Sequence, residues 1–254
     1  MAHCRSEAIV LRRFDYSETS QIVWAYTRDF GKEKLIAKGA KRLTKSALGA
    51  MDPLTHVDLV FLDRQREGLR TLTEWELLDS FHGLREDLDR LYRASYAVQL
   101  VSELTEEGEA NPRIFDLLLR ILKRFCEDGD HGKLIFAFEL ALLRCVGYLP
   151  RLVRCAHCGS DLSGGGRRCF SIREGGVLCE ECCGADADAI DMSRAALTAM
   201  ATLAHGDRAR IGRLQLPPRV AAEMRRVMNA HMSALLGREL KMMKHLEFKE
   251  RKTS

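Results

Sequence analysis

Two pairs of cysteines constrain this chain more than any other feature of its sequence. Two residues separate the members of each pair, and twenty residues lie between the pairs, which are Cys155 with Cys158 and Cys179 with Cys182. This spacing is typical of a Cys4 zinc ribbon, because each tight turn directs two sulfurs at one ion and the second turn completes a tetrahedron. Such a site has no open coordination position, so we expect one structural Zn²⁺ per chain.

Neighbouring residues leave the identity of the four ligands open. Cys183 can replace Cys182, and His157 or Cys169 can stand in for one sulfur. The alternative is that the cysteines are free thiols or disulfides. Residues 1–10 contain no apolar run after a basic start, and no stretch approaches the ~18 apolar residues of a membrane span. We therefore expect a cytoplasmic protein without membrane contact, in which paired C-x2-C motifs bind metal more often than they form disulfides.

Basic residues are clustered although the net charge is only +4. Residues 28–45 contain seven basic side chains against Asp29 and Glu33. The seven are Arg28, Lys32, Lys34, Lys38, Lys41, Arg42 and Lys45. Local clusters of this kind suit a polyanion such as nucleic acid, but charge alone is equally compatible with a solvated face.

The first eighty residues have the pattern of β-strands. Turn residues separate five short segments that are rich in β-branched, leucine and aromatic side chains. The segments are Glu7–Arg13, Ser20–Thr27, Lys32–Lys38, Thr55–Leu62 and Leu69–Leu78. Five strands in this length predict a small closed barrel over residues 1–80, with the oligonucleotide-binding (OB) barrel as the leading fold and an SH3-like barrel as the alternative.

Beyond Phe81 the apolar spacing becomes helical. Asn111 and Pro112 form a capping pair before one helix, and Ser193 can cap another. A further helix is expected to end at Gly237, and a last one to span residues 238–248. The chain is thus predicted to be an α+β protein, with a helical domain over residues 81–254 and the ribbon, residues 150–185, inserted in it.

Motifs of catalysis are missing from the sequence. It contains no phosphate-binding loop, no dinucleotide-binding glycine motif, no H-E-x-x-H and no zinc-deaminase signature. Carboxylate clusters such as Glu106 with Glu107 are expected on solvated helix faces. We therefore expect a protein that is not an enzyme.

Two strings in combination carry a resemblance to a known family. The first consists of residues 7–12 (EAIVLR), 16–20 (YSETS) and 38–42 (KGAKR). The second consists of residues 147–150 (GYLP) followed by Cys155-x2-Cys158-Gly159. In this order the chain resembles the RecO family of bacterial DNA-repair and recombination mediators.

The resemblance implies a fold and a function without turnover. The fold is an N-terminal OB barrel and a helical domain with an inserted zinc ribbon. RecO-like proteins bind single- and double-stranded DNA, anneal complementary strands, and work with RecR and in some cases RecF. They bind the C-terminal tail of the single-stranded DNA-binding protein and help load RecA onto coated DNA. Their expected location is the bacterial cytoplasm, in association with the nucleoid.

On this interpretation the basic segment contacts DNA phosphates. Arg12 joins the seven basic residues of 28–45 as an expected DNA-binding residue. Trp24 and Tyr26 can stack on bases, or they can fill the barrel together with Ile22 on the same strand face. The ribbon arginines Arg151, Arg154, Arg167 and Arg168 are expected either to extend the basic surface or to be simply solvated. Alternatives from other classes are a zinc-containing DNA-repair enzyme and a zinc-ribbon transcription regulator.

Overall fold

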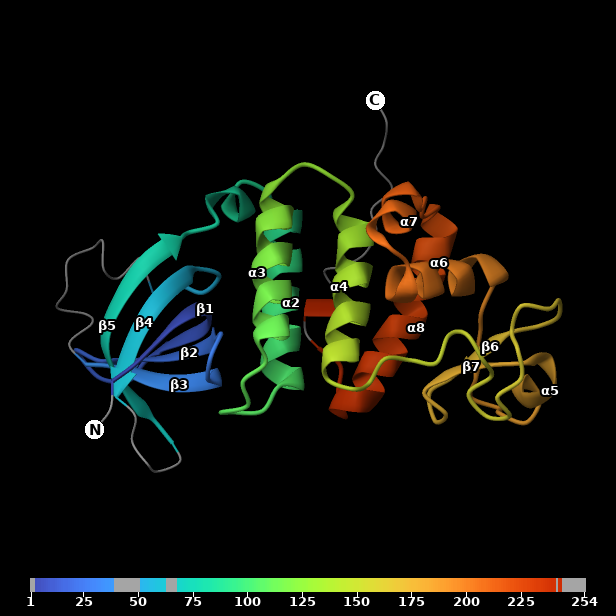
Figure 1. Cartoon of the computed structure of the whole chain (residues 1–254), viewed down its shortest axis with the longest axis horizontal. Helices are drawn as coiled ribbons and strands as arrows, with labels where there is room; N and C mark the ends of the chain where they lie inside the picture. The colour runs from blue at the N-terminus through green and yellow to red at the C-terminus, as the bar shows by residue number, and fades with distance from the viewer. Residues whose placement is uncertain (1–2, 39–50, 63–67, 241, 244–254) are drawn as a thin grey trace. The chain divides into compact units, whose positions relative to one another are not determined.

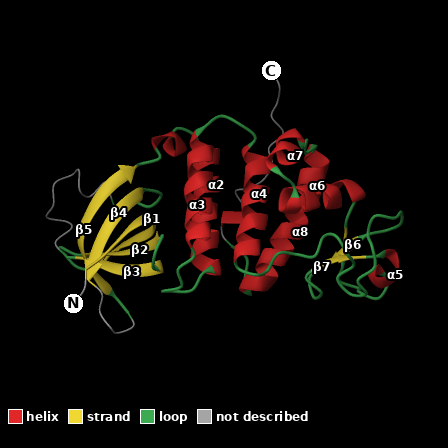
Figure 2. Ribbon diagram, viewed as in Figure 1, coloured by secondary structure: helices red, strands yellow, loops and turns green. Residues whose placement is uncertain are grey.

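The structure is a computed structural model that describes residues 3–38, 51–62, 68–240 and 242–243. The chain divides into two compact units, Met1–Gly129 and Asp130–Ser254. The first unit contains a five-stranded sheet followed by helices, and the second is mainly helical with a small sheet (Figures 1 and 2). None of the described helices is long and apolar enough to cross a membrane. The mixed α+β class that the sequence predicted is confirmed.

The strands of the first unit form a closed barrel in the order β1-β2-β3-β5-β4. Their bounds are β1 His3–Asp15, β2 Gln21–Thr27, β3 Gly31–Ala37, β4 His56–Leu62 and β5 Arg70–Asp79. All neighbouring strands are antiparallel except β3 and β5, which run parallel and pair only over 35–37 and 70–72. Each of the five segments that the sequence assigned to strands coincides with one of these strands.

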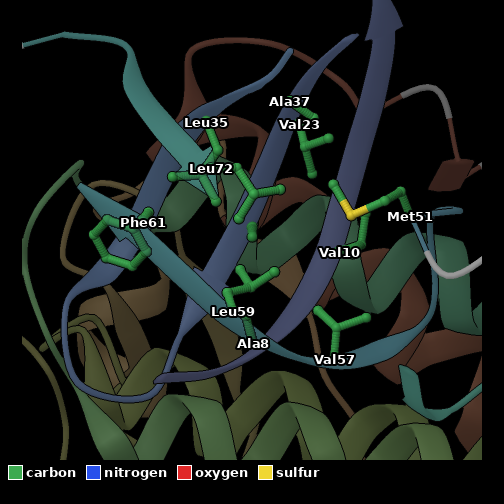
Figure 3. Packing of buried hydrophobic residues seen from close by; sticks show 11 residues of the cluster. Ala8, Val10, Val23, Leu35, Ala37, Met51, Val57, Leu59, Phe61 and Leu72 are labelled. Atoms are coloured by element: carbon green, nitrogen blue, oxygen red, sulfur yellow. The ribbon is translucent and has the colours of Figure 1, made fainter. Parts of the chain in front are cut away.

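Mostly small and branched aliphatic side chains, together with Met51 and Phe61, fill the barrel interior, as Figure 3 shows. Its members are Ala8, Val10, Val23, Ala25, Leu35, Ala37, Met51, Val57, Leu59, Phe61 and Leu72. On β2 the inward residues are Val23 and Ala25, so Trp24 and Tyr26 point outward. The interpretation that these two rings fill the barrel is therefore wrong. The narrow interior takes Val and Ala from β2. Trp24 is half-buried on the outer side of the strand, and Tyr26 points to the same side but is fully buried.

Two helices complete the first unit, and the end of the first of them is hydrogen-bonded to the start of β3. A short 3₁₀ helix, η2 (His82–Arg85), precedes α2 (Leu88–Leu104) and α3 (Pro112–Cys126), and the Asn111 side chain caps α3 as expected. The Lys32 ammonium donates to the carbonyl oxygens of Ser102 at 2.7 Å and Thr105 at 2.5 Å, at the C-terminal end of α2. A cation is favourable there because the last carbonyls of a helix carry partial negative charge.

Gly31, the first residue of β3, makes a close backbone approach possible. Its φ is +74°, and a Cβ added there would lie 2.1 Å from the carbonyl oxygen of Glu109. Only glycine fits this position. Nearby, the backbone N–H of Gly108 donates to the Lys32 carbonyl at 3.0 Å, so the loop between α2 and α3 covers the start of β3.

The second unit is built around the helices α4 (His131–Cys145), α6 (Arg194–His205), α7 (Arg208–Arg213) and α8 (Pro218–Leu236). Ser193 caps α6, and Gly237 ends α8 in the left-handed conformation, both as expected. Buried within this unit, Glu139 of α4 accepts a hydrogen bond at 2.5 Å from Arg225 of α8, whose guanidinium also lies over the Phe136 ring. This pairing lets two charged groups lie among apolar side chains.

The cysteine-rich segment lies between α4 and α6 in the chain. It contains β6 (Cys169–Ser171), β7 (Gly176–Leu178), the four-residue helix α5 (Glu180–Cys183) and β8 (Ile190–Asp191). The strands form a small antiparallel sheet in the order β7-β6-β8. We call residues 150–191 the ribbon.

Two expectations about organisation remain open. The predicted boundary at residues 80/81 stays a prediction, and α2 and α3 belong to the same compact unit as the barrel. The helix expected over residues 238–248 falls largely outside the described residues.

Candidate metal centre and candidate nucleic-acid interface

Four cysteine sulfurs gather in the ribbon within 4.8 Å of one another. They belong to Cys155, Cys158, Cys179 and Cys182. The sulfurs of Cys158 and Cys179 are 3.7 Å apart. A tetrahedron with metal–sulfur bonds of about 2.3 Å requires a sulfur–sulfur separation of about 3.8 Å. The donor set therefore fits a tetrahedral metal ion that prefers thiolate ligands.

Backbone hydrogen bonds shape the turns that present these sulfurs. The N–H of Cys155 donates to the carbonyl of Ser160 at 2.8 Å, and the N–H of Gly159 donates back to the carbonyl of Cys155 at 3.0 Å. Gly159 closes this turn with a φ of +75°, a value that favours glycine. The second pair is placed by α5, where Cys179 stands at the N-cap and Cys182 in the helix. Together the tight turn and the short helix bring both pairs to one point.

The pKa values of three of these thiols are shifted in different directions. Burial raises the pKa of Cys155, but hydrogen bonds from backbone N–H groups, with those of Cys158 and Cys179 the largest, outweigh it and lower the pKa to about 6. Hydrogen bonds also lower the pKa of Cys179, chiefly the one from the Cys182 backbone. The pKa of Cys182 is raised to about 12, first by its side-chain hydrogen bond to Cys179. Without a metal ion the cluster thus combines thiolate with thiol, and a divalent cation would displace the remaining protons.

The alternative ligands named from the sequence make other contacts. Cys169 of β6 and Cys183 of α5 form a disulfide with a Cα–Cα separation of 5.8 Å. The Nδ1 atom of His157 lies 3.5 Å from the carboxylate of Glu174. Disulfide formation was considered from the sequence for the paired cysteines, but the pair that forms it is a different one.

The ribbon arginines bind groups of the ribbon itself. Arg168 is buried and donates to the carbonyls of Gly164 and Gly165. Arg151 donates to the Ala156 carbonyl at 3.1 Å, and Arg167 forms an ion pair with Asp191 at 2.7 Å. Arg154 lies 3.5 Å from the Gly159 carbonyl, so all four arginines named from the sequence have a partner within the ribbon, although Arg151, Arg154 and Arg167 stay exposed.

The outer face of β1, β2 and β3 carries a different arrangement. Arg12, Trp24 and Lys34 stand directly opposite one another across the three strands. The Lys34 ammonium lies 5.3 Å from the centre of the half-buried Trp24 ring. Residues opposite one another on neighbouring strands share a face, so one aromatic ring stands between two cations.

The next row on this face is apolar and ends in exposed aromatic rings. Phe14 lies opposite Ile22, which lies opposite Ile36. Phe14 is 51% exposed, and Tyr16, just beyond β1, is 62% exposed. We call Arg12, Phe14, Tyr16, Trp24 and Lys34 the aromatic–basic face. Exposed rings beside cations are what single-stranded nucleic acid requires, since bases stack on the rings and phosphates pair with the cations.

Several of the expected DNA-binding residues have partners within the first unit. Arg12 donates to Glu103 of α2 at 3.1 Å and stays partly exposed. Arg28 donates to Asp116 of α3 at 2.5 Å and lies over the Phe115 ring. Burial lowers the pKa of Lys32, whose ammonium donates to carbonyl oxygens at the end of α2. Arg28 and Lys32 therefore have structural roles that the sequence did not indicate.

The rest of the expected set is only partly described. Lys38 follows β3 and is exposed. Lys41, Arg42 and Lys45 lie outside the described residues, so their assignment stays a prediction. Tyr26, the second ring proposed to stack on bases, is fully buried, which excludes it from a surface in this conformation.

Sequence reasoning did not identify Phe14 and Tyr16 as site residues. The signal was present, because positions 12, 14 and 16 alternate Arg, Phe and Tyr at the end of a strand. We predicted that this strand ends at Arg13, whereas β1 continues to Asp15. The early end left Phe14 outside the predicted strand and concealed the alternation.

A second row of the barrel, across β1, β4 and β5, is acidic. Glu7, Asp58 and Glu76 stand in one row across β1, β4 and β5. Arg5 donates to Asp58 at 2.7 Å and offsets part of this charge. Repulsion of phosphates by this row leaves the aromatic–basic face as the side of the barrel suited to a polyanion.

Comparison with known proteins places the chain in one family. Residues 1–81 match the family model "Recombination protein O N terminal", and residues 85–244 match "Recombination protein O C terminal". The chain is 34% identical over 242 residues to the DNA repair protein RecO of Bacillus pumilus, covering 95% of this chain and 93% of that protein. It is 36% identical over 237 residues to the RecO of Pelotomaculum thermopropionicum, with coverage of 93% and 91%. The RecO of Bacillus subtilis is 32% identical over 243 residues, with coverage of 96% and 93%.

Proposed function

The chain belongs to the RecO family of DNA repair proteins, and from this premise we propose that it is a recombination mediator that binds DNA and anneals complementary strands. In this role it acts without chemical turnover. One observation supports DNA binding most directly: exposed rings and cations alternate on the outer face of β1–β3, where Trp24 stands between Arg12 and Lys34.

The barrel then acts as an OB-type domain. Five strands in a closed barrel with this strand order are compatible with that fold, whose ligand face is formed around the second and third strands. Bases stack on Phe14, Tyr16 and Trp24, and the neighbouring cations pair with phosphates. Stacking tolerates any base, so binding depends little on sequence.

Annealing follows from the electrostatics of this face. Two DNA strands repel each other through their phosphates, and a protein that neutralises phosphates on both lowers the barrier to their encounter. No ATP is needed, because the free energy comes from pairing of the strands. Lys38 and the basic residues up to Lys45 extend the cationic path in this proposal.

The ribbon serves as a structural module that holds Zn²⁺. The four sulfurs of Cys155, Cys158, Cys179 and Cys182 would complete a Cys4 site, and the ion would supply folding energy and no catalysis. The residues themselves fix the site through the turn at Gly159 and the position of α5. In this proposal the main DNA surface is on the barrel, because the ribbon arginines Arg151, Arg167 and Arg168 have partners within the ribbon.

We further propose the partners of the family. They are RecR, the acidic C-terminal tail of the single-stranded DNA-binding protein and, in some contexts, RecF. Through them the protein would help load RecA onto coated DNA in the bacterial cytoplasm.

The test is strand annealing without ATP. Two complementary oligonucleotides are mixed in the presence of saturating single-stranded DNA-binding protein, and duplex formation is followed by fluorescence. The proposal expects the protein to accelerate annealing, and expects a Tyr16→Ala, Trp24→Ala double variant to lose most of this acceleration. An intact, zinc-loaded protein that neither binds DNA nor accelerates annealing would overturn the proposal.

A further inference from the structure

We propose that Cys169 and Cys183 are a redox modification site that controls how tightly the ribbon retains its metal ion. The inference rests on the zinc site proposed above and is independent of DNA binding. It begins from the position of the disulfide beside the four-sulfur cluster.

The short helix α5 connects the two sites. It consists of Glu180–Cys183, with Cys179 at its N-cap. Cys179 and Cys182 direct their sulfurs into the metal cluster, whereas Cys183 is buried and joined to Cys169 of β6. One helical turn therefore carries two metal ligands and one half of the disulfide.

Such a helix cannot be stable by itself. Helix formation has a costly nucleus, and isolated helices shorter than about 12 residues are marginal in water. The N-cap Cys179 makes no side-chain capping hydrogen bond that would compensate. Within the described ribbon, cysteine sulfurs attach α5 to its surroundings in two ways. Cys179 and Cys182 would bind the proposed metal ion, and Cys183 is bonded to Cys169 of β6.

The disulfide restricts the segment that contains both ligands. It joins residues 14 positions apart in the sequence, and Cys179 and Cys182 lie inside the closed loop. A cross-link reduces the conformations open to this loop when the metal is absent. Less ordering is then required on metal binding, so the oxidised ribbon binds the ion more tightly than the reduced one.

The other pair of ligands has backbone supports in addition to the disulfide. The N–H of Ala156 donates to the carbonyl of Val177 at 2.8 Å, and that of Val177 donates to the carbonyl of Arg151 at 2.9 Å. These bonds attach the turn of Cys155 and Cys158 to β7. The redox state therefore acts most directly on the half of the metal site that α5 carries, because Cys183 itself belongs to that helix.

The modification is a thiol–disulfide exchange with a low-molecular-weight disulfide. One protein thiolate attacks the small disulfide and releases a small thiol, and the second protein thiolate then displaces the second small thiol. Two protein S–H bonds and one small S–S bond become one protein S–S bond and two small thiols, so two electrons pass to the small molecule together with two protons.

Coupling between the two sites must be reciprocal. If the disulfide raises the affinity for the metal by some factor, the metal raises the resistance of the disulfide to reduction by the same factor. Burial of both cysteines, 0% exposed for Cys169 and 4% for Cys183, adds a kinetic barrier, because a reductant reaches them only when the ribbon opens.

The experiment compares zinc retention in the two redox states of the full-length protein. Protein loaded with Zn²⁺ is incubated with oxidised glutathione or with a phosphine reductant, and mass spectrometry after alkylation counts the thiols. Zinc transfer to a colorimetric chelator is then followed over time. We expect release from the reduced form to be about tenfold faster, the size typical of losing a group that supports metal ligands.

Variants separate the disulfide from a general effect of reductant. Cys169→Ala with Cys183→Ala should release zinc as the reduced protein does and should no longer respond to the phosphine. Cys145→Ala, which changes a cysteine of α4 outside the ribbon, should behave as the unmodified chain. If the double variant fails to fold, the rates of zinc release from the oxidised and reduced unmodified protein still show whether the disulfide affects metal retention.

The outcomes distinguish this inference from the zinc site on which it rests. Equal release from two zinc-loaded redox states would overturn the redox site alone. An absence of bound zinc in both states would overturn the proposed zinc site as well.

Discussion

The barrel and the ribbon both contain basic residues clustered in the sequence, but the contacts of these residues differ between the two regions. On the barrel, Lys34 lies over an aromatic ring and Lys38 is exposed. In the ribbon, Arg168 and Arg151 donate to carbonyls of the ribbon, and Arg167 pairs with Asp191. A count of cations therefore does not identify a nucleic-acid surface. What identifies it is which cations stand beside exposed rings and which are bonded within their own domain.

Removal of the metal should have the largest effect, and it should separate the two regions. A Cys155→Ala, Cys179→Ala variant is expected to lose bound zinc and the fold of the ribbon, because structural zinc sites contribute about 10 kcal/mol or more to folding at neutral pH. Hydrogen exchange should rise across residues 150–191, while affinity for single-stranded DNA stays near that of the parent. A large loss of DNA affinity in a protein whose barrel is intact would contradict the division of roles.

Removal of an exposed ring should have the next largest effect. Tyr16→Ala is expected to weaken binding of single-stranded DNA, since stacking of one base on an aromatic ring contributes about 1–3 kcal/mol. The matched control is Tyr148→Ala, because Tyr148 is 55% exposed, similar to Tyr16 at 62%, but lies before the ribbon. Fluorescence anisotropy with a labelled oligonucleotide measures both, and equal losses would contradict the assignment of Tyr16 to the binding face.

Charge reversal compares a cation of the barrel with one of the ribbon. Lys38→Glu should weaken binding to all sequences alike and reduce the slope of log affinity against log salt by about 0.7 per lost phosphate contact on single strands. Arg173→Glu changes an exposed arginine of the ribbon and should leave the slope unchanged. If the salt slope falls for the ribbon variant and not for the barrel variant, the ribbon and not the barrel contacts the phosphates.

The smallest expected effect is a gain of affinity. Glu103 of α2 accepts a hydrogen bond from Arg12 and so competes with phosphate for a cation of the aromatic–basic face. Exposed ion pairs contribute about 0.2–1 kcal/mol, so Glu103→Gln should tighten DNA binding by up to about fivefold. Glu86→Gln, an exposed carboxylate elsewhere in the first unit, is the control. Weaker binding by the Glu103 variant would show that the pair supports the site instead of competing with it.

Features with a local physical cause were predictable from the sequence. The cysteine spacing predicted the set of four sulfurs that the fold brings together, because the turn that aligns each pair is only a few residues long. Asn111, Ser193 and Gly237 were correctly placed at helix ends, since capping depends on neighbouring backbone groups. The strands were predictable because alternation of apolar and polar side chains also depends only on neighbouring residues of one strand.

Features that depend on distant parts of the chain were not predictable. Arg28 and Lys32 belong to the basic cluster in the sequence, but their partners lie on α3 and at the end of α2. The direction of Trp24 depends on which face of β2 closes the barrel, and alternation alone does not determine that. The disulfide between Cys169 and Cys183 likewise depends on the meeting of β6 and α5.

The parallel seam between β3 and β5 has a consequence for how the barrel folds. The ladders joining β1, β2 and β3 form across short turns, whereas β3 and β5 pair over only three positions and are far apart in the sequence. Closing a long loop costs conformational entropy before its contacts can form, so such pairings form late. The aromatic–basic face lies on these three strands and, for Tyr16, on the turn between β1 and β2. We expect that, during synthesis, a chain that has not yet reached β5 already pairs β1, β2 and β3, and that closure of the barrel then fixes their curvature.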